Sequence, residues 1–139
     1  MRVHVKATRT ARGKFCGQLT KVTARIGYEE LTVYVARKYR PGSCNYRSIL
    51  DHENQHVAVF RDTMTKYAAR VEHRLNRTAG RMKPVLASTA NQAAKLLQNK
   101  LQRELKPLFR EMDREMDHRN GKLDTAKNYR QEQARCSNW

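Results

Sequence analysis

Residues 49–60 read ILDHENQHVAVF and open a long segment with helical periodicity. From Ile49 to Leu75 a largely apolar stripe steps by three or four residues, as one face of an α-helix does over about seven turns. Ser43 precedes this segment as a suitable N-cap, and Thr-Ala-Gly at 78–80 follows it as a suitable end. The sequence therefore predicts one long amphipathic helix between these two signals.

The same segment contains an HExxH pattern formed by His52, Glu53 and His56. Residues four apart on a helix lie on one face, so both histidines can reach a single metal ion. Zinc hydrolases use this pattern with the histidines as ligands and the glutamate as general base. Because so short a motif also occurs by chance, the prediction depends on a helix, an inward-facing site and a third ligand.

The N-terminal third has the alternation of a small β-sheet. Residues 2–8 alternate valines with polar residues, and residues 15–26 form a second candidate strand. Residues 31–36 alternate Leu, Val and Val against Thr, Tyr and Ala, a composition that strands favour. Arg-Pro-Gly-Ser at 40–43 ends this region with turn residues. We expect an antiparallel sheet of about three strands.

A second helical segment is expected to begin at Pro84, which suits an early helical position. Its apolar stripe continues toward Asn-Gly at 120–121, a suitable stop. Asp124 or Thr125 can cap a last short helix that reaches about Cys136. Two long helices with a short connection favour an antiparallel pair.

These elements predict an α+β fold in a single domain that spans residues 1–139. Its strand region covers residues 1–41, and its helical region covers residues 42–139. The small antiparallel sheet is expected to pack on a long antiparallel helical hairpin that carries the HExxH motif, with a short C-terminal helix after it.

The hairpin also predicts where a third metal ligand lies. A chain folded about residue 83 places the HExxH motif opposite a window at residues 110–118. His118 is the first choice, because it is the only histidine in that window and imidazole is a favoured zinc ligand. Glu115 is the alternative ligand. Glu115 or Asp117 can also accept a hydrogen bond from the second ring nitrogen of a metal-bound histidine and so orient its ring. A solvated, charged helix face is the competing interpretation of this window.

The chain has 29 Lys and Arg residues against 13 Asp and Glu, a net charge of +16. Such a chain associates electrostatically with acidic polymers or anionic surfaces. The alternative function is therefore a basic polyanion- or nucleic-acid-binding module in which HExxH is accidental. Against it, the aromatic content is 7% and no motif interleaves aromatic with basic residues. A helical hairpin whose histidines are satisfied core groups is a further alternative.

Cys16, Cys44 and Cys136 lack the paired spacing of a cysteine zinc site, so we expect one disulfide and one free thiol. Cys16–Cys44 is the preferred pairing, because it would tie the sheet to the first helix, and Cys44–Cys136 is the alternative. Three reduced thiols in a cytoplasmic protein are the competing interpretation. No apolar run is long enough to cross a bilayer, and an exported protein would already have lost its leader, because the first residues lack the apolar core of a signal peptide.

Two stretches of the chain resemble a known family. Residues 43–59, which lead through HExxH, and residues 115–118, Glu-Met-Asp-His, are similar to the bacterial predicted secreted Zn-dependent protease family of unknown function. Members carry an HExxH helix and a later E-T-x-H-G stretch, from which this chain departs at Met116 and Arg119. The resemblance implies a periplasmic or secreted protein.

Carried over by position, the resemblance implies His52 and His56 as Zn²⁺ ligands and Glu53 as base. It also implies Glu115 and His118 as the matched pair of the second motif. The expected activity is a zinc peptidase, in which a metal-activated water hydrolyses peptide bonds and the glutamate transfers the proton to the leaving amine.

Two further features bear on catalysis. Tyr129 and Tyr46 are candidates for stabilising the transition state, because each lies near a predicted motif in the sequence. An edge strand at residues 31–37 is expected to hold an extended peptide substrate by strand addition.

Overall fold

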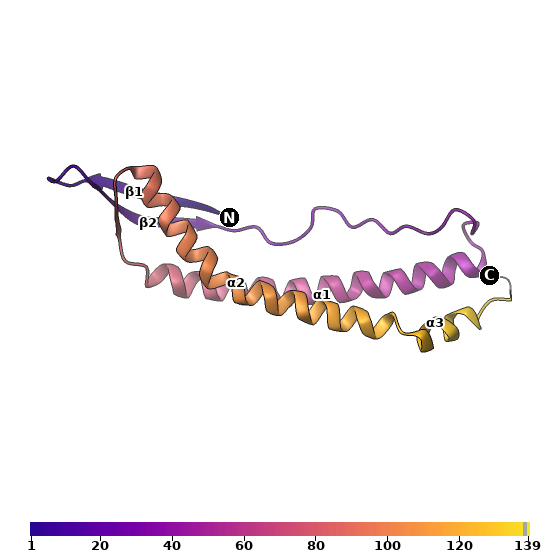
Figure 1. Cartoon of the computed structure of the whole chain (residues 1–139). Helices are drawn as coiled ribbons and strands as arrows, with labels where there is room; N and C mark the ends of the chain where they lie inside the picture. The colour runs from indigo at the N-terminus through magenta and orange to yellow at the C-terminus, as the bar shows by residue number, and fades with distance from the viewer. Residues whose placement is uncertain (138) are drawn as a thin grey trace. The chain divides into compact units, whose positions relative to one another are not determined.

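The computed structural model describes residues 1–137 and 139 and has an α+β fold (Figure 1). A three-stranded antiparallel sheet packs on a long antiparallel helix pair, and a short helix follows, as the sequence predicts. The elements in chain order are β1 (Arg2–Arg9), β2 (Phe15–Thr23), α1 (Cys44–Gly80), β3 (Val85–Ala87), α2 (Ala90–Leu123) and α3 (Ala126–Gln133).

The chain divides into two compact units. Unit 1 comprises Met1–Ile26 and Tyr67–Arg110, and unit 2 comprises Gly27–Lys66 and Glu111–Trp139. Unit 1 therefore contains the sheet, and unit 2 contains the HExxH motif and α3. The long helices α1 and α2 are both divided between the units, so each unit contains one part of each helix.

The sheet of unit 1 has the strand order β1-β2-β3. β1 pairs antiparallel with β2, with a bulge between His4 and Val5, and β2 pairs antiparallel with β3 through three residues. The third strand is therefore Val85–Ala87, and the predicted strand at residues 31–36 is wrong, because those residues have no regular secondary structure. Their alternation is real, but a strand also needs a neighbour with which to pair its backbone groups.

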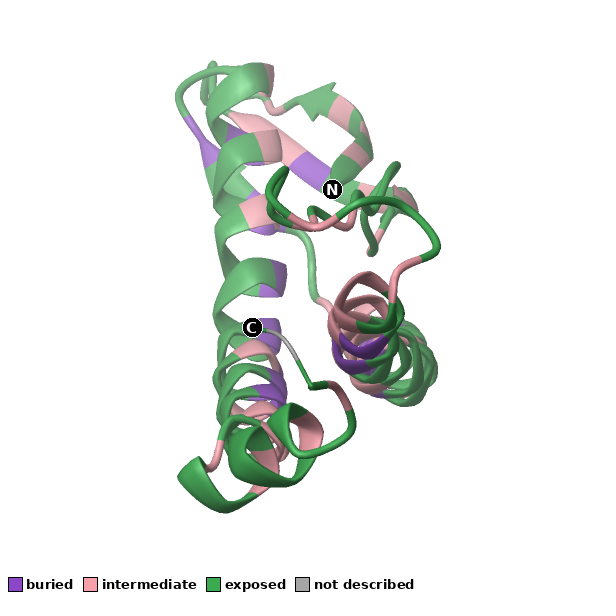
Figure 2. Cartoon of the chain, turned by 90° about the vertical axis from the view of Figure 1, so that its right-hand side faces the viewer, coloured by how far each residue is buried: buried purple, intermediate pink, exposed green. Residues whose placement is uncertain are grey.

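The core of unit 1 lies where the apolar stripes of the helices meet the sheet. Its buried residues recur at helical spacing and are Val71 and Leu75 of α1 with Leu101, Leu105 and Leu108 of α2. Val3 of β1 and Leu19 and Val22 of β2 pack against them. Figure 2 shows the buried residues along one side of α2. Each large aliphatic side chain that is fully buried contributes about 1.5–3 kcal/mol, so the burial of this cluster stabilises unit 1.

Gly17 lets the sheet and α2 approach closely in unit 1. A Cβ atom at this position would lie 2.6 Å from the Cβ of Ala93 and 3.2 Å from a methyl carbon of Val5. Gly17 is buried, and Ala93 is fully buried. The absence of a side chain at this point of β2 is therefore required by the packing of a helix on the strand.

The helix ends agree with the sequence at α1 and differ at α2. Ser43 caps α1 as predicted, since its Oγ accepts a hydrogen bond from the Tyr46 N–H at 3.2 Å. Pro84 does not begin a helix, because the residues after it pair with β2. Thr89 caps α2 instead, through an Oγ1 that accepts from the Gln92 N–H at 3.1 Å.

Unit 2 has a smaller apolar core than unit 1. Its buried apolar side chains, among the described residues, are Met112 and Met116 of α2. The other buried side chains of this unit are polar, namely Ser48, His52 and Thr63 of α1. Where apolar burial is this limited, covalent cross-links and polar networks supply a larger share of the stability.

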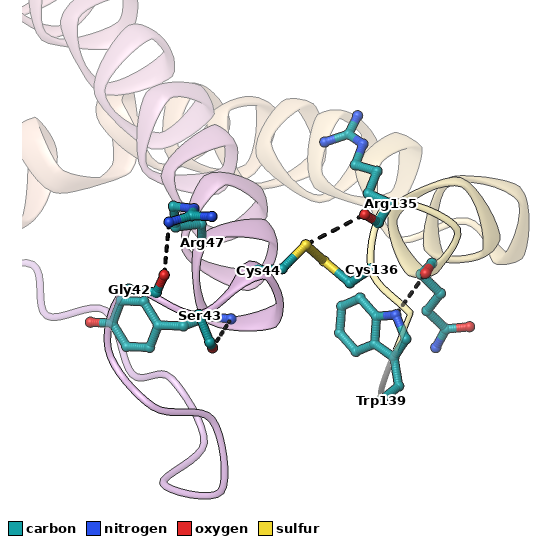
Figure 3. Close-up of a disulfide and its surroundings, with 9 residues drawn as sticks. Gly42, Ser43, Cys44, Arg47, Arg135, Cys136 and Trp139 are labelled. Atoms are coloured by element: carbon teal, nitrogen blue, oxygen red, sulfur yellow. Dashed lines mark hydrogen bonds between the residues drawn. A yellow bond between two sulfur atoms is a disulfide. The ribbon is translucent and has the colours of Figure 1, made fainter.

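A disulfide between Cys44 and Cys136 ties the start of α1 to the segment after α3 (Figure 3). Cys16 is a free thiol in β2, where it pairs with Thr8 on one side and Leu86 on the other. The preferred pairing of Cys16 with Cys44 is therefore wrong, and the alternative is correct. Cys44 is bonded to Cys136, which leaves Cys16 without a cysteine partner among the described residues.

Candidate metal centre

Two histidines and one carboxylate converge in unit 2. His52 and His56 project from neighbouring turns of α1, and Asp124 lies between α2 and α3. The two Nε2 atoms are 3.0 Å apart. The Asp124 Oδ1 lies 3.2 Å from the Nε2 of His52 and 3.1 Å from the Nε2 of His56. These three residues can hold a metal ion.

The spacing of the three ligand atoms matches that of a small metal site. In a tetrahedral zinc site with arms of 2.0–2.1 Å, ligand atoms lie about 3.3 Å from one another. The triangle formed by the histidine nitrogens and the carboxylate oxygen has sides of 3.0–3.2 Å. Two imidazoles and one carboxylate are also a donor set that suits zinc and related divalent ions. The cluster therefore needs little rearrangement to receive an ion.

The partners of the histidines determine which ring nitrogen faces the cluster. The Oε1 of Glu132 lies 2.9 Å from the Nδ1 of His52, and the Oδ1 of Asn120 lies 2.9 Å from the Nδ1 of His56. Both partners are acceptors, so the tautomer that satisfies them has a proton on each Nδ1 and directs each Nε2 into the cluster. A cation, either a proton or a metal ion, would favour the close approach of the two Nε2 atoms and the carboxylate oxygen.

The same contacts shift the ionisation of the cluster. Burial lowers the pKa of His52, but hydrogen bonds and negative charge from Glu132 and Asp124 outweigh burial and raise it above 6.5. Burial raises the pKa of Asp124, but the hydrogen bond from Tyr129 and the two histidines outweigh burial and lower it. The Tyr129 hydroxyl donates to the Asp124 Oδ1 at 2.8 Å, which raises the pKa of the tyrosine. Asp124 is therefore ionised at neutral pH, the state that a metal ligand needs.

One side of the cluster is open. The His52 ring is buried, whereas the side chain of Asp124 is 43% exposed. A cleft of about 240 Å³ lies next to His52, and its lining includes Glu53, Tyr129 and Glu132 but neither His56 nor Asp124. The HExxH glutamate thus lines the same cleft as a cluster histidine. Catalytic metal sites keep an open position next to such a group, whereas structural sites are closed.

The structure brings the two HExxH histidines together but does not bring the predicted third ligands to them. His118 is exposed on α2, and Asp117 is exposed beside it. The Glu115 carboxylate pairs with the Lys66 Nζ at 2.7 Å. Among the described residues, Asp124 is the third member of the cluster.

Asn120, rather than a residue near 110, lies opposite His56 because the two long helices are not joined directly. The strand β3 pairs with β2 between them, and α2 begins only at Ala90. A chain folded at residue 83 by a short turn therefore gives the wrong register in unit 2. The histidine pair faces a part of α2 that lies closer to its C-terminal end.

The two candidate tyrosines have different positions. The ring of Tyr129 lies 5.3 Å from the ring of His52, and its hydroxyl binds Asp124. Tyr46 is not part of the cluster, and its N–H is engaged by the Ser43 cap. Tyr129 is therefore a residue of the candidate metal centre, whereas Tyr46 belongs to the first turn of α1.

Asp124 and Glu132 are residues of the candidate site that sequence reasoning missed. The sequence suggests Asp124 only as a helix cap, and that role belongs to Thr125, whose Oγ1 accepts from an N–H of the first turn of α3. The pairing of Cys44 with Cys136 is the signal that leads to them. A disulfide there brings the acidic residues before Cys136 next to the start of α1.

No protein-family model matches the chain, and neither curated proteins nor solved structures give a significant match. None of the helices in the described part of the chain combines the length and apolarity needed to cross a bilayer. The case for a function therefore depends on the geometry of the metal centre.

Proposed function

We propose that the protein is a zinc-dependent peptidase. The observation that carries the proposal is the convergence of His52 Nε2, His56 Nε2 and Asp124 Oδ1 within 3.2 Å, with both Nδ1 atoms held by oxygen acceptors. The choice of peptide bonds as the substrate is what the resemblance of residues 43–59 to the secreted Zn-dependent protease family implies, although no family model matches the chain. In this proposal Asp124 takes the ligand position expected for His118.

Each residue around the site has its own proposed role in peptide hydrolysis. Zinc bound there would supply Lewis acidity to the peptide carbonyl and lower the pKa of a water molecule. Glu53, in the cleft beside His52, acts as general base: it takes a proton from the attacking water and gives it to the leaving amine. Glu132 orients the ring of His52, and Tyr129 holds the carboxylate of Asp124.

The disulfide supports a periplasmic or secreted location for this activity. Disulfides persist in oxidising compartments and are rare in the cytoplasm. The Cys44–Cys136 bond closes a segment with a sequence separation of 92 residues and holds α3, which carries Glu132, next to α1. A reducing compartment would therefore remove a constraint on the proposed site.

The test combines metal analysis with peptide hydrolysis. The purified oxidised protein is expected to bind one zinc ion per chain and to cleave a fluorescently labelled unfolded protein. His52→Ala and His56→Ala are expected to lose the zinc. Glu53→Gln is expected to retain the zinc and to lose hydrolysis by about 10²-fold or more, because a general base contributes about that much.

Asp51→Asn is the matched control for Glu53→Gln, because Asp51 is exposed and adjacent to the motif but is not part of the cluster. Its zinc content and hydrolysis should equal those of the parent. A folded protein that stays free of metal after incubation with zinc would overturn the proposal. Equal hydrolysis by the parent and Glu53→Gln would remove Glu53 from the role of base.

A further inference from the structure

The positive charge of the chain is concentrated in one unit. Unit 1 holds 17 of the 29 Lys and Arg residues but 2 of the 13 Asp and Glu residues, so its net charge is +15. Unit 2 holds the remaining 12 and 11, so its net charge is +1. The metal centre lies in the nearly neutral unit. Most of the positive charge therefore lies in a different unit from the candidate metal centre. A surface with such a charge attracts a polyanion.

A cleft in unit 1 gathers several of these cations. Its volume is about 670 Å³, and it is lined by the end of α1, the turn after it and α2. The basic residues of the lining are Arg77, Arg81, Lys83, Lys100 and Arg103, against a single acid, Glu104. The C-terminal end of a helix carries about half a negative charge, which five cationic side chains outweigh. The cleft therefore favours an anionic ligand.

An arginine stripe extends this cleft along α1. Arg70, Arg74, Arg77 and Arg81 follow at spacings of four, three and four residues, which places them on one side of the helix and its end. The first three line a neighbouring cleft of about 350 Å³. At 1.5 Å per residue the stripe spans about 16 Å. One strand of nucleic acid presents about five phosphates over that length, and arginine is suited to bidentate contact with phosphate.

Aromatic side chains do not line the basic surface of unit 1. Phe15 and Phe109 are half-buried and Tyr67 is fully buried, and these are the aromatic residues of this unit. The large exposed aromatic side chains, such as Tyr34 and Trp139, belong to unit 2. Stacking on exposed aromatic rings is how proteins engage the bases of single strands. Contact at unit 1 is therefore limited to the anionic backbone of a polymer.

We infer that the arginine-lined cleft of unit 1 binds the backbone of a phosphodiester polymer without preference for its bases. The site is formed by Arg77, Arg81, Lys83, Lys100 and Arg103, and the stripe through Arg70 and Arg74 continues it. The inference does not depend on zinc or on peptide hydrolysis. Polyanion binding and an HExxH metal centre then belong to different units of one chain. The two functions are therefore compatible and are not alternatives.

The test uses the full-length oxidised protein and fluorescently labelled 30-nucleotide DNA, single-stranded and duplex, in two base compositions. Anisotropy titrations between 50 and 200 mM salt give the affinity and its salt dependence. The triple variant Arg77→Gln/Arg81→Gln/Arg103→Gln is expected to weaken binding about tenfold or more and to reduce the slope of log affinity against log salt by about 2.7, since each lost phosphate contact removes about 0.9. Base composition should have no effect.

A triple variant of unit 2, Arg37→Gln/Arg61→Gln/Arg114→Gln, removes the same charge from exposed positions and is the matched control. It should bind DNA within about twofold of the parent, and the single variant Lys100→Gln should fall between the parent and the cleft triple. Equal losses in the two triple variants would overturn the inference. So would equal affinity for polyglutamate, or tighter binding to vesicles of anionic phospholipid that the cleft triple leaves unchanged. Zinc content, measured in every variant, reports separately on the metal centre.

Discussion

The Oε1 of Glu132 lies 2.9 Å from the Nδ1 of His52, although the two residues are 80 positions apart in the chain. This contact fixes the ring nitrogen that the proposed ligand presents to a metal. Partners of this kind contribute about 10- to 100-fold to metal affinity. Glu132→Ala is therefore expected to lower the zinc affinity by about that factor, measured by competition with a chromophoric chelator.

Glu132→Gln separates the hydrogen bond from the charge. The amide oxygen of glutamine can accept the His52 proton, so this variant should lose less affinity than Glu132→Ala. Glu132→Ala with the zinc affinity of the parent would mean that the contact does not orient a ligand.

Asp124 and His118 give opposite predictions for the third ligand. Asp124 Oδ1 lies within 3.2 Å of both histidine nitrogens, whereas His118 is exposed on α2. Asp124→Ala should therefore reduce zinc binding to the level of a two-ligand site, and His118→Ala should leave it unchanged. Zinc stoichiometry by mass spectrometry under native conditions distinguishes them. Loss of zinc in His118→Ala alone would restore the ligand expected from the sequence.

Loss of the Cys44–Cys136 disulfide is expected to affect unit 2 selectively. Unit 2 has few buried apolar side chains, and disulfides that close long loops contribute about 2–5 kcal/mol. In Cys44→Ser/Cys136→Ser, hydrogen exchange should accelerate at amides of α3 and the first turns of α1, while the strands of unit 1 keep their protection. Zinc affinity should fall as well.

Cys16→Ser is the control for this disulfide variant, because Cys16 is a free thiol in unit 1. It should retain the zinc affinity of the parent and the protection of α3. Uniform exchange changes across both units in the disulfide variant would show that the cross-link stabilises the whole chain rather than unit 2.

Gly17→Ala is expected to destabilise unit 1. The added methyl group would lie 2.6 Å from the Cβ of Ala93, so the strand or α2 must move. Such overpacking costs about 1–3 kcal/mol, which urea unfolding measures directly. Gly121→Ala is the matched control, because a Cβ at that helical position has no neighbour within 4 Å and alanine favours a helix by up to about 1 kcal/mol. Equal stability of the two variants would contradict the close contact at Gly17.

The sequence was sufficient to predict features that depend on local periodicity. The stripe from Ile49 to Leu75 and the Ser43 cap predicted α1, and the valines of residues 2–8 predicted β1. Interactions between distant residues were less accessible. The register of α2 against α1 depends on the three-residue strand Val85–Ala87, which is too short to be recognised from alternation. Because of this strand, His56 lies opposite Asn120 and not opposite the expected window at residues 110–118.

The site was predictable to the same extent. His52, His56 and Glu53 belong to one helix and were identified by spacing alone. Asp124, Glu132 and Asn120 reach the histidines only through the tertiary fold, so no local pattern marks them. The pairing of Cys44 with Cys136 would have supplied that information, but three cysteines do not determine their own pairing.

The separation of 68 to 72 residues between the HExxH histidines and Asp124 has a consequence for how the protein matures. A chain released from the ribosome before residue 124 already contains the complete HExxH motif, yet it lacks the carboxylate that completes the cluster and the cysteine that anchors α3. The three members of the cluster can therefore come together only after residue 124 has been synthesised, and α3 is anchored only after Cys44 and Cys136 have been oxidised.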